Sequence, residues 1–298
     1  MIQFAFATAL LLAPQTPPPP QDAPSVLEDV VVDGRSLRET VDRFVDDVVA
    51  PPAGRGPARW DRKVCVGVVN LENDTAQALV DQISSVALQV GLEVGEPGCS
   101  ANILVVAASD GQAMARALVE ASPRAFRPPY AGAARGRSAL DRFQNSEGAV
   151  RWWHVSIPVH SETGEVAVRI PGYAAPLIRQ DNGRLTTRIQ NDLRRAFVIV
   201  DMDEAADITV EQLGDYIGMV ALAQIDPEAE TASYDTILNL FDGAEHRRAM
   251  TAWDISYLTS LYDAELNRRS PNQQSGEVST LMFRDVQSTE PDEPEPAP

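Results

Sequence analysis

The sequence has 298 residues, of which 44% are hydrophobic, and this composition supports a folded core and excludes a largely disordered chain. Asp and Glu number 43 against 25 Lys and Arg, which gives a formal net charge of -18. The resulting field repels phosphate backbones, so nucleic-acid binding is excluded as a first hypothesis.

The N-terminal segment predicts export. Residues 4–13 read FAFATALLLA, and a proline-rich tract follows at once. This apolar run is too short to cross a membrane, which takes roughly 20 residues, but it has the length and position of a secretory signal peptide. We therefore predict a signal peptide over residues 1–13, a proline-rich linker over 14–35, and an exported, periplasmic protein without a membrane span.

An amphipathic helix is predicted over residues 36–50. Ser36 and Glu39 form a capping-box pattern, and apolar residues then recur at helical spacing up to Pro51. The apolar face of this helix either packs on the main domain or docks on a partner. Residues 51–59, which read PPAGRGPAR, predict a linker.

A single α+β domain is predicted over residues 60–283. Its first part reads as strand, helix and strand, over residues 64–69, 75–90 and 103–108, which form one βαβ unit. A helix over 112–120 follows, and the stretch 122–147 is rich in Pro, Gly and Arg and predicts a long loop. Further strand patterns cover residues 152–159, 166–170, 184–190 and 197–200. The fold class is therefore a mixed β-sheet with packed helices.

The last third of the chain predicts helices. Thr209 to Gln212 form a second capping box, which opens a helix that ends near Asp226. An apolar segment over residues 234–241 and a helix that begins at Thr251 come next. Residues 284–298 are acidic and proline-rich, so we predict a disordered tail.

The two cysteines fit an exported protein. Cys65 lies in the first predicted strand, and Cys99 lies in a turn just before the second. If these strands are neighbours, the two sulfur atoms can form a disulfide, which stabilises the fold by about 3 to 4 kcal/mol on the chain-entropy model. Two buried free thiols are the alternative.

Common catalytic patterns are absent from the sequence, which has no GxSxG, P-loop, HExxH or strand-associated GxGxxG motif. The three histidines are His154, His160 and His246. Asp207, Glu211 and Asp215 stand at i, i+4 and i+8, and this acidic stripe is either solvated or able to gather a cation such as Ca²⁺.

Adjacent tryptophans, Trp152 and Trp153, fall inside a predicted strand. Neighbouring residues of a strand point to opposite faces of the sheet, so the two rings cannot share one carbohydrate-binding surface. At least one of them is therefore expected in the core.

Residues 211–221 read EQLGDYIGMVA, which resembles the HExxHxxGxxH helix of metzincin zinc metallopeptidases at Leu213, Gly214 and Gly218. By this resemblance the three ligand histidines fall on Glu211, Asp215 and Ala221, and the general-base glutamate falls on Gln212. Downstream, Thr236, Ile237, Leu238 and Asn239 stand where metzincins have their Met-turn. Residues 250–254 and 261–263 resemble the helix that follows it.

The chain from residue 60 to 262 is also similar to a group of uncharacterised exported bacterial proteins. Together the resemblances imply a zincin-like core whose cleft is lined by Glu211, Gln212, Asp215, Gly218 and Ala221. Zinc chemistry requires three ligands and a base near the metal-bound water. Ala221 cannot coordinate a metal and Gln212 cannot accept a proton, so the resemblance implies a scaffold without metal, cofactor or catalytic residues.

The leading hypothesis is therefore a non-catalytic exported protein that binds a protein or peptide of the cell envelope. Two alternatives stay open. One is a hydrolase of another class, in which Asp215 acts with Glu211 or Asp235 as general acid and base. The other is an assembly protein that docks on its partner through the helix over residues 36–50.

Overall fold

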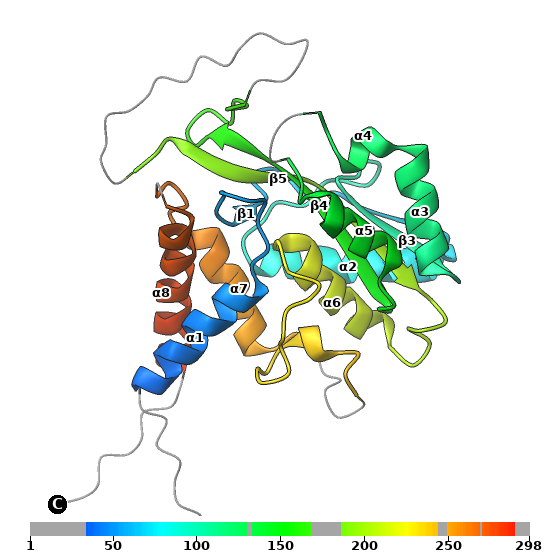
Figure 1. Cartoon of the computed structure of the whole chain (residues 1–298). Coiled ribbons are helices and arrows are strands. Elements are labelled where there is room, and N and C mark those ends of the chain that lie inside the picture. The colour runs from blue at the N-terminus through cyan, green and yellow to red at the C-terminus, as the bar shows by residue number, and fades with distance from the viewer. Residues whose placement is uncertain (1–33, 130–132, 169–185, 244–248, 269, 290–298) are drawn as a thin grey trace, which may run out of the picture. The chain divides into compact units, whose positions relative to one another are not determined.

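The computed structural model describes residues 34–129, 133–168, 186–243, 249–268 and 270–289, which form a mixed α/β fold (Figure 1). The predicted signal peptide and most of the proline-rich linker lie outside the described residues. No helix in these ranges is long and apolar enough to cross a membrane.

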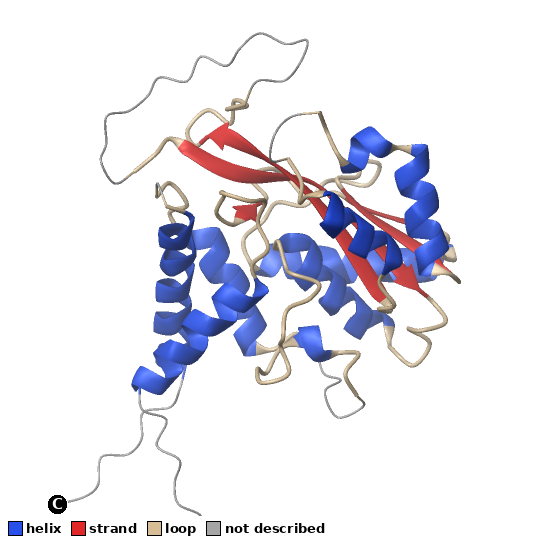
Figure 2. Ribbon diagram, in the orientation of Figure 1, coloured by secondary structure: helices blue, strands red, loops and turns tan. Residues whose placement is uncertain are grey.

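The central sheet is mixed, as predicted (Figure 2). Three strands pair in parallel in the order β2 (Val66–Val69), β3 (Ile103–Ala108) and β5 (Ile189–Asp201). The short strand β1 (Ala58–Arg59) is parallel to the first half of β5, and β4 (Val150–His160) runs antiparallel along it. Helix α2 (Asn73–Gln89) connects β2 to β3, which confirms the predicted βαβ unit.

Helices cover both faces of the sheet. The larger core includes buried residues of α1 (Gly34–Val48), α2, α6 (Val210–Leu222), α7 (Ala252–Asp263) and α8 (Pro271–Thr289). The smaller core includes residues of α3 (Gly111–Ala121), α4 (Pro123–Phe126) and α5 (Arg137–Asn145). Trp152 belongs to the larger core and Trp153 to the smaller one, so the two rings point to opposite faces as predicted.

Helix α1 belongs to the same folded unit as the sheet. Phe44 is fully buried, and its ring makes edge-to-face contacts with Tyr234, Trp253 and Tyr257 at centroid distances of 5.0, 5.4 and 5.5 Å. The apolar face that was a candidate docking surface is therefore covered by the chain itself. The domain begins at α1 rather than at residue 60.

The predicted linker over residues 51–59 is also part of the fold, because it contains β1. Arg59 lies in this strand and donates through Nη1 to the backbone carbonyls of Leu261, Tyr262 and Ala264, at the C-terminal end of α7. This contact satisfies carbonyl groups that a helix leaves unpaired.

Two loop predictions were wrong. The stretch 122–147 contains α4 and α5, because Phe126, Leu140 and Phe143 are buried in the smaller core and outweigh the surrounding Pro, Gly and Arg. Residues 284–289 belong to α8 rather than to a tail, because α8 continues with Val278 and Met282 buried and Val286 packed against the larger core. Residues 290–298 lie outside the described residues.

Two further elements differ from their predicted extent. In the segment predicted as a strand over 166–170, the described part contains only an isolated bridge between Val166 and Val159, and residues 169–185 lie outside the described ranges. The apolar segment over 234–241 contains the short 3-10 helix η1 (Ile237–Asn239).

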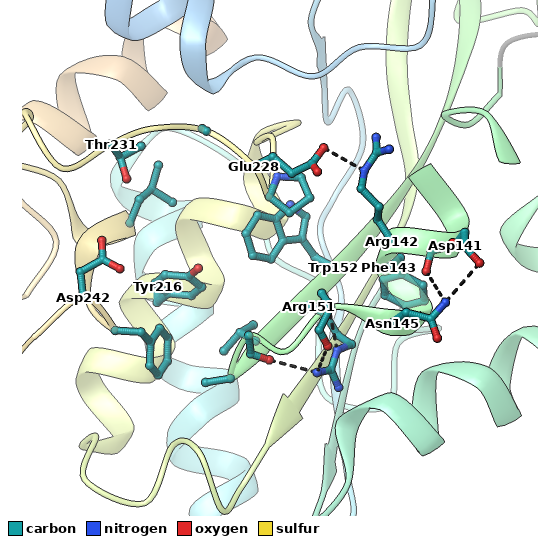
Figure 3. Close-up of a pocket in the computed structure, with 18 residues that line it drawn as sticks. Asp141, Arg142, Phe143, Asn145, Arg151, Trp152, Tyr216, Glu228, Thr231 and Asp242 are labelled. Atoms are coloured by element: carbon teal, nitrogen blue, oxygen red, sulfur yellow. Dashed lines mark hydrogen bonds and ion pairs between the residues drawn. The ribbon is translucent and has the colours of Figure 1, made fainter. Parts of the chain in front are cut away.

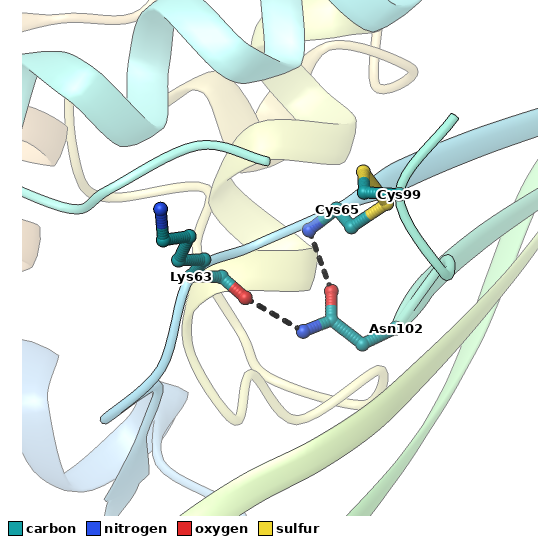
Figure 4. Close-up of a disulfide and its surroundings, with 4 residues drawn as sticks. All are labelled: Lys63, Cys65, Cys99 and Asn102. Carbon is teal, nitrogen blue, oxygen red and sulfur yellow. Dashed lines mark hydrogen bonds between the residues drawn. A yellow bond between two sulfur atoms is a disulfide. The ribbon is translucent and has the colours of Figure 1, made fainter. Parts of the chain in front are cut away.

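The disulfide prediction is confirmed (Figure 4). Cys65 and Cys99 are bonded across a Cα–Cα distance of 6.1 Å, next to the paired strands β2 and β3. Asn102 reinforces the junction, because its Oδ1 accepts from the Cys65 amide at 2.7 Å and its Nδ2 donates to the Lys63 carbonyl at 2.9 Å. Gly95 is required beside the bond, since a Cβ at this position would lie 2.6 Å from the Cys99 sulfur.

Candidate functional site

Helix α6, which carries the metzincin-like pattern, is buried from Leu213 to Leu222 and packs on α2. A Cβ on Gly214 would lie 2.5 Å from Cγ of Gln82, and a Cβ on Gly218 would lie 3.1 Å from Cβ of Val86. Both distances are shorter than ordinary van der Waals contacts. The two glycines that support the family resemblance are therefore needed for the close approach of α6 to α2.

The remaining pattern residues have separate environments. Glu211 is exposed on the first turn of α6. Gln212 completes the capping box, since its Oε1 accepts from the Thr209 amide and its own amide donates to the Thr209 hydroxyl, both at 3.2 Å. Ala221 is fully buried, and its carbonyl accepts from the Trp60 indole at 2.9 Å.

Asp215 holds three segments together. Its side chain is 5% exposed, Oδ1 accepts from Nε2 of Gln82 at 2.6 Å, and Oδ2 accepts from the Met250 amide at 2.8 Å. The carboxylate thereby joins α6 to α2 and to the segment before α7. Glu211 and Asp235, its suggested partners in acid–base catalysis, are both exposed, and none of the three acids lines the cavity described below.

The Met-turn-like segment, residues 236–239, is held in place by Asp254 on α7. This fully buried carboxylate accepts from the Thr236 hydroxyl at 2.5 Å, from the Ile237 amide at 2.8 Å and from the Thr251 amide at 2.9 Å. Burial raises the pKa of Asp254, and these hydrogen bonds oppose the shift. Asn239 completes the turn by donating to the carbonyls of Thr231 and Tyr234.

A cavity of about 500 Å³ lies between α5, the beginning of β4, α6 and residues 227–242 (Figure 3). One wall is aromatic. The Trp152 and Tyr216 rings meet edge to face at 6.1 Å, and Tyr216 meets Phe241 in the same way at 5.1 Å. Leu238 of the Met-turn-like segment also lines this wall. We call this space the aromatic cavity.

The rim of the aromatic cavity is polar. Arg142 and Glu228 form an ion pair at 2.8 Å, and Asp141 accepts a hydrogen bond from Asn145 at 3.1 Å. Burial, and to a smaller extent the charge of Asp242, raises the pKa of Tyr216. The Tyr216 phenol is therefore neutral at physiological pH and can donate or accept a hydrogen bond.

Arg151 supports the cavity at the C-terminal end of α5. The side chain is buried, and Nη2 donates to the carbonyls of Ser146 and Gly148 at 2.9 and 3.1 Å. Burial lowers the pKa of Arg151, and the charges of Asp201 and Asp110 oppose the shift. Arginine stays protonated in proteins, so this side chain is a fixed positive charge beside the cavity.

The described residues contain no group of three or more His, Cys, Asp or Glu side chains that could hold a metal ion. Burial lowers the pKa of His154 to about 4, and Nδ1 of His160 accepts from the amides of Glu162 and Thr163 at 3.3 Å. Asp207 and Glu211 are exposed whereas Asp215 is buried and paired, so the predicted acidic stripe does not converge on one point. His246 lies outside the described residues.

The aromatic cavity was not predicted from the sequence as a site. Its wall combines Trp152 from β4, Tyr216 from α6 and Phe241 from the segment after η1, and these residues are far apart in the chain. The available signal was Tyr216, which lies inside the metzincin-like pattern and directly follows Asp215. The structure therefore brings two of the singled-out segments to the cavity, through Tyr216 and Leu238.

The fold and the cavity define a mixed α/β protein with one disulfide and an aromatic-walled space of the size that small ligands and side chains occupy. Comparisons of this chain with family models, curated proteins and solved structures found no match.

Proposed function

We propose that this chain is an exported, non-catalytic binding protein whose aromatic cavity takes a side chain from a protein or peptide of the cell envelope. The observation that carries this proposal is the continuous wall of Trp152, Tyr216 and Phe241 along a cavity of about 500 Å³. Ligand pockets of roughly 300 to 1,000 Å³, lined mainly by apolar and aromatic groups with a few polar ones, are typical of binding sites.

Charge favours a cationic ligand, because the described lining of the aromatic cavity contains three carboxylates, Asp141, Glu228 and Asp242, and two arginines, Arg142 and Arg151. Within the described residues, neither Asp141 nor Asp242 forms an ion pair, although both line the aromatic cavity. Aromatic faces attract ammonium and guanidinium groups, and a net charge of -18 draws cations toward the protein. A Lys or Arg side chain of an envelope protein therefore fits the chemistry of the wall and of the rim.

Export is supported by two observations. Cys65 and Cys99 form a disulfide, and disulfides persist in oxidising compartments such as the periplasm. The apolar run over residues 4–13 has the length and position of a signal peptide. Detection of the mature chain in a periplasmic fraction, with a new N-terminus near residue 14, is the expected result.

A scaffold derived from metallopeptidases stays part of the proposal. It is supported by the chain order of the patterns on α6, η1 and α7 and by their contacts, since Asp215 accepts from the Met250 amide and Asp254 accepts from the Ile237 amide. The close packing of α6 on α2 requires glycine at positions 214 and 218, and this requirement is independent of any metal site.

The proposal is tested with a short peptide that is blocked at both ends and carries a central arginine. The same peptide with citrulline, which has nearly the same shape without the charge, is the matched ligand control. We expect saturable calorimetric binding of the arginine peptide, much weaker binding of the citrulline peptide, and an intact peptide by mass spectrometry after prolonged incubation.

A substitution that fills the aromatic cavity tests whether the peptide binds there. Ala229 is half-buried in the cavity lining, so Ala229→Trp should abolish peptide binding, whereas Ala78→Trp on the exposed face of α2 should leave it unchanged. Binding that survives Ala229→Trp, or no binding of either peptide to the wild-type protein, would contradict the proposal. If the wild-type protein cleaves the peptide and the Ala229→Trp variant does not, the proposal that the protein is non-catalytic would be contradicted.

A further inference from the structure

A second concave site lies where α4 approaches strands β4 and β5, and it shares no residue with the aromatic cavity. Its volume is about 400 Å³. Its lining among the described residues contains three arginines and no acidic side chain: Arg124, Ala125, Pro128, Val155, Arg194 and Arg195. We call it the arginine pocket.

A β-bulge brings two neighbouring arginines of β5 into this pocket. Val155 pairs with Arg195 and Ser156 pairs with Leu193, so Arg194 is the extra residue of the bulge. In a regular strand, adjacent side chains point to opposite faces. Here Leu193 and Ala196 both contribute to the larger core, and the two arginines between them line the pocket with Val155 of the smaller core. Bulges commonly redirect side chains at functional sites.

Within the described residues, two of the three arginines of the pocket have no acidic partner. Arg194 forms an ion pair with Asp192 at 3.4 Å. Arg124 and Arg195 are both exposed, and neither makes a hydrogen bond or an ion pair with any residue of the chain's described part. None of the acidic residues in the described ranges lines this pocket to balance the guanidinium groups.

The chemistry of the lining defines the ligand. Guanidinium groups are planar, stay charged, and donate paired hydrogen bonds that match the oxygen atoms of phosphate and carboxylate. Val155, Ala125 and Pro128 form an apolar side that reduces the screening of these charges by water. A ligand with two negative charges would form ion pairs with Arg124 and Arg195 together and would also interact with Arg194.

We propose that the arginine pocket binds a small, doubly charged oxyanion, of the phosphate or dicarboxylate class. The site is independent of the aromatic cavity, which lies among different residues and favours cations. It also gives a role to Arg124 and Arg195, which have no acidic partner in the described part of a chain with a net charge of -18.

The test is calorimetric titration of the full chain with inorganic phosphate and, separately, with succinate, each at constant ionic strength. We expect saturable binding of at least one of the two anions, with a dissociation constant of about 1 mM or tighter. The more tightly bound anion identifies the ligand class. Binding of neither anion in this range would overturn the proposal.

Variants locate the bound anion. Arg195→Gln and Arg124→Gln should each weaken binding about tenfold, as expected for the loss of a charged hydrogen bond, and the double variant should show no binding. Arg284→Gln is the matched control, because Arg284 is an exposed arginine on α8 outside the pocket. All variants should melt at the wild-type temperature in anion-free buffer. Equal anion affinity in the double variant and the wild type would overturn the proposal.

Discussion

The two sides of helix α6 contrast in what their residues contact. Toward α2, Gly214 and Gly218 allow close helix packing and Asp215 ties three segments together. Toward the aromatic cavity, Tyr216 presents its ring to Trp152 and Phe241. The residues that support the family resemblance thus lie mainly on the packed side, while the residue next to them forms the wall of the candidate site. The packing of α6 on α2 is therefore enough to account for these glycines.

The largest predicted effect is on the packed side. Asp215→Ala removes the acceptor for two donors, Nε2 of Gln82 and the Met250 amide, and leaves both without a partner at half-buried positions. Each buried unsatisfied donor costs about 1 to 3 kcal/mol, so we expect the free energy of unfolding to fall by about 3 kcal/mol. Urea denaturation followed by circular dichroism measures this change.

Glu211→Ala is the matched control for Asp215→Ala, because it removes an exposed carboxylate from the same helix. Its effect should stay within about 0.5 kcal/mol. If Glu211→Ala and Asp215→Ala lower the free energy of unfolding by similar amounts, the hydrogen bonds of Asp215 do not explain its contribution to stability.

A pH effect of nearly the same size comes from His154 on β4, which lies near the Val220 backbone of α6. Its pKa falls from 6.5 to about 4 because burial penalises the charged ring. A depressed pKa means that the folded state binds fewer protons than the unfolded state between these values. The free energy of unfolding should therefore fall by up to about 3 kcal/mol as the pH drops from 6.5 to 4.

The contribution of His154 must be separated from that of Asp192, whose pKa burial raises to about 6. A raised carboxylate pKa has the opposite sign, so its contribution weakens the fold as the pH rises from 3.8 through 6. The measured quantity is therefore the difference in unfolding free energy between wild type and His154→Leu across this range. A difference that is constant with pH would show that His154 is not the group that titrates.

Substitution of a glycine on α6 tests the packing of α6 on α2, and the expected change in stability is smaller. Gly218→Ala places a methyl group 3.1 Å from Val86, and such overpacking costs about 1 to 3 kcal/mol. In Gly276→Ala, on α8, the added methyl group meets no atom within 4 Å. That variant should gain about 0.5 to 1 kcal/mol from helix propensity. Equal melting temperatures for the two variants would contradict the close packing of α6 on α2.

The smallest effect on stability is expected on the cavity side of α6. Tyr216→Phe keeps the ring and removes a hydroxyl that makes no hydrogen bond within the described residues, so the unfolding free energy should change by less than about 1 kcal/mol. Affinity for the arginine peptide should fall about two- to tenfold if the hydroxyl contacts the ligand. Loss of stability without loss of affinity would assign Tyr216 to packing.

Much of the fold could be predicted because its elements have strong local patterns. The strand over residues 103–108 matches β3, the capping box at Thr209 marks the beginning of α6, and α7 begins after Thr251 as predicted. Helices α4 and α5 could not be predicted in this way. Helix α4 has only four residues and α5 only nine, so the helical spacing of Ala139, Leu140 and Phe143 covers little more than one turn and gives a weak signal. Both helices are stabilised by tertiary burial in the smaller core.

The candidate sites were harder to predict than the fold. The aromatic cavity depends on Trp152, Tyr216 and Phe241, which only the tertiary structure brings together. The arginine pocket depends on a bulge at Arg194, and no local composition distinguishes a bulge from a regular strand. The disulfide was predictable because two adjacent parallel strands place Cys65 and Cys99 at the same end.

The central claim is that the aromatic cavity binds a cationic side chain, and the tryptophan indole resonances test it most directly. Trp152 lines the cavity, whereas Trp153 lies on the opposite face of the same strand and donates to the Phe126 carbonyl in the smaller core. In an NMR titration with the arginine peptide, the indole N–H signal of Trp152 should shift with saturation while that of Trp153 stays in place. An unchanged Trp152 signal at saturating peptide, or a shift of Trp153 alone, would contradict the account.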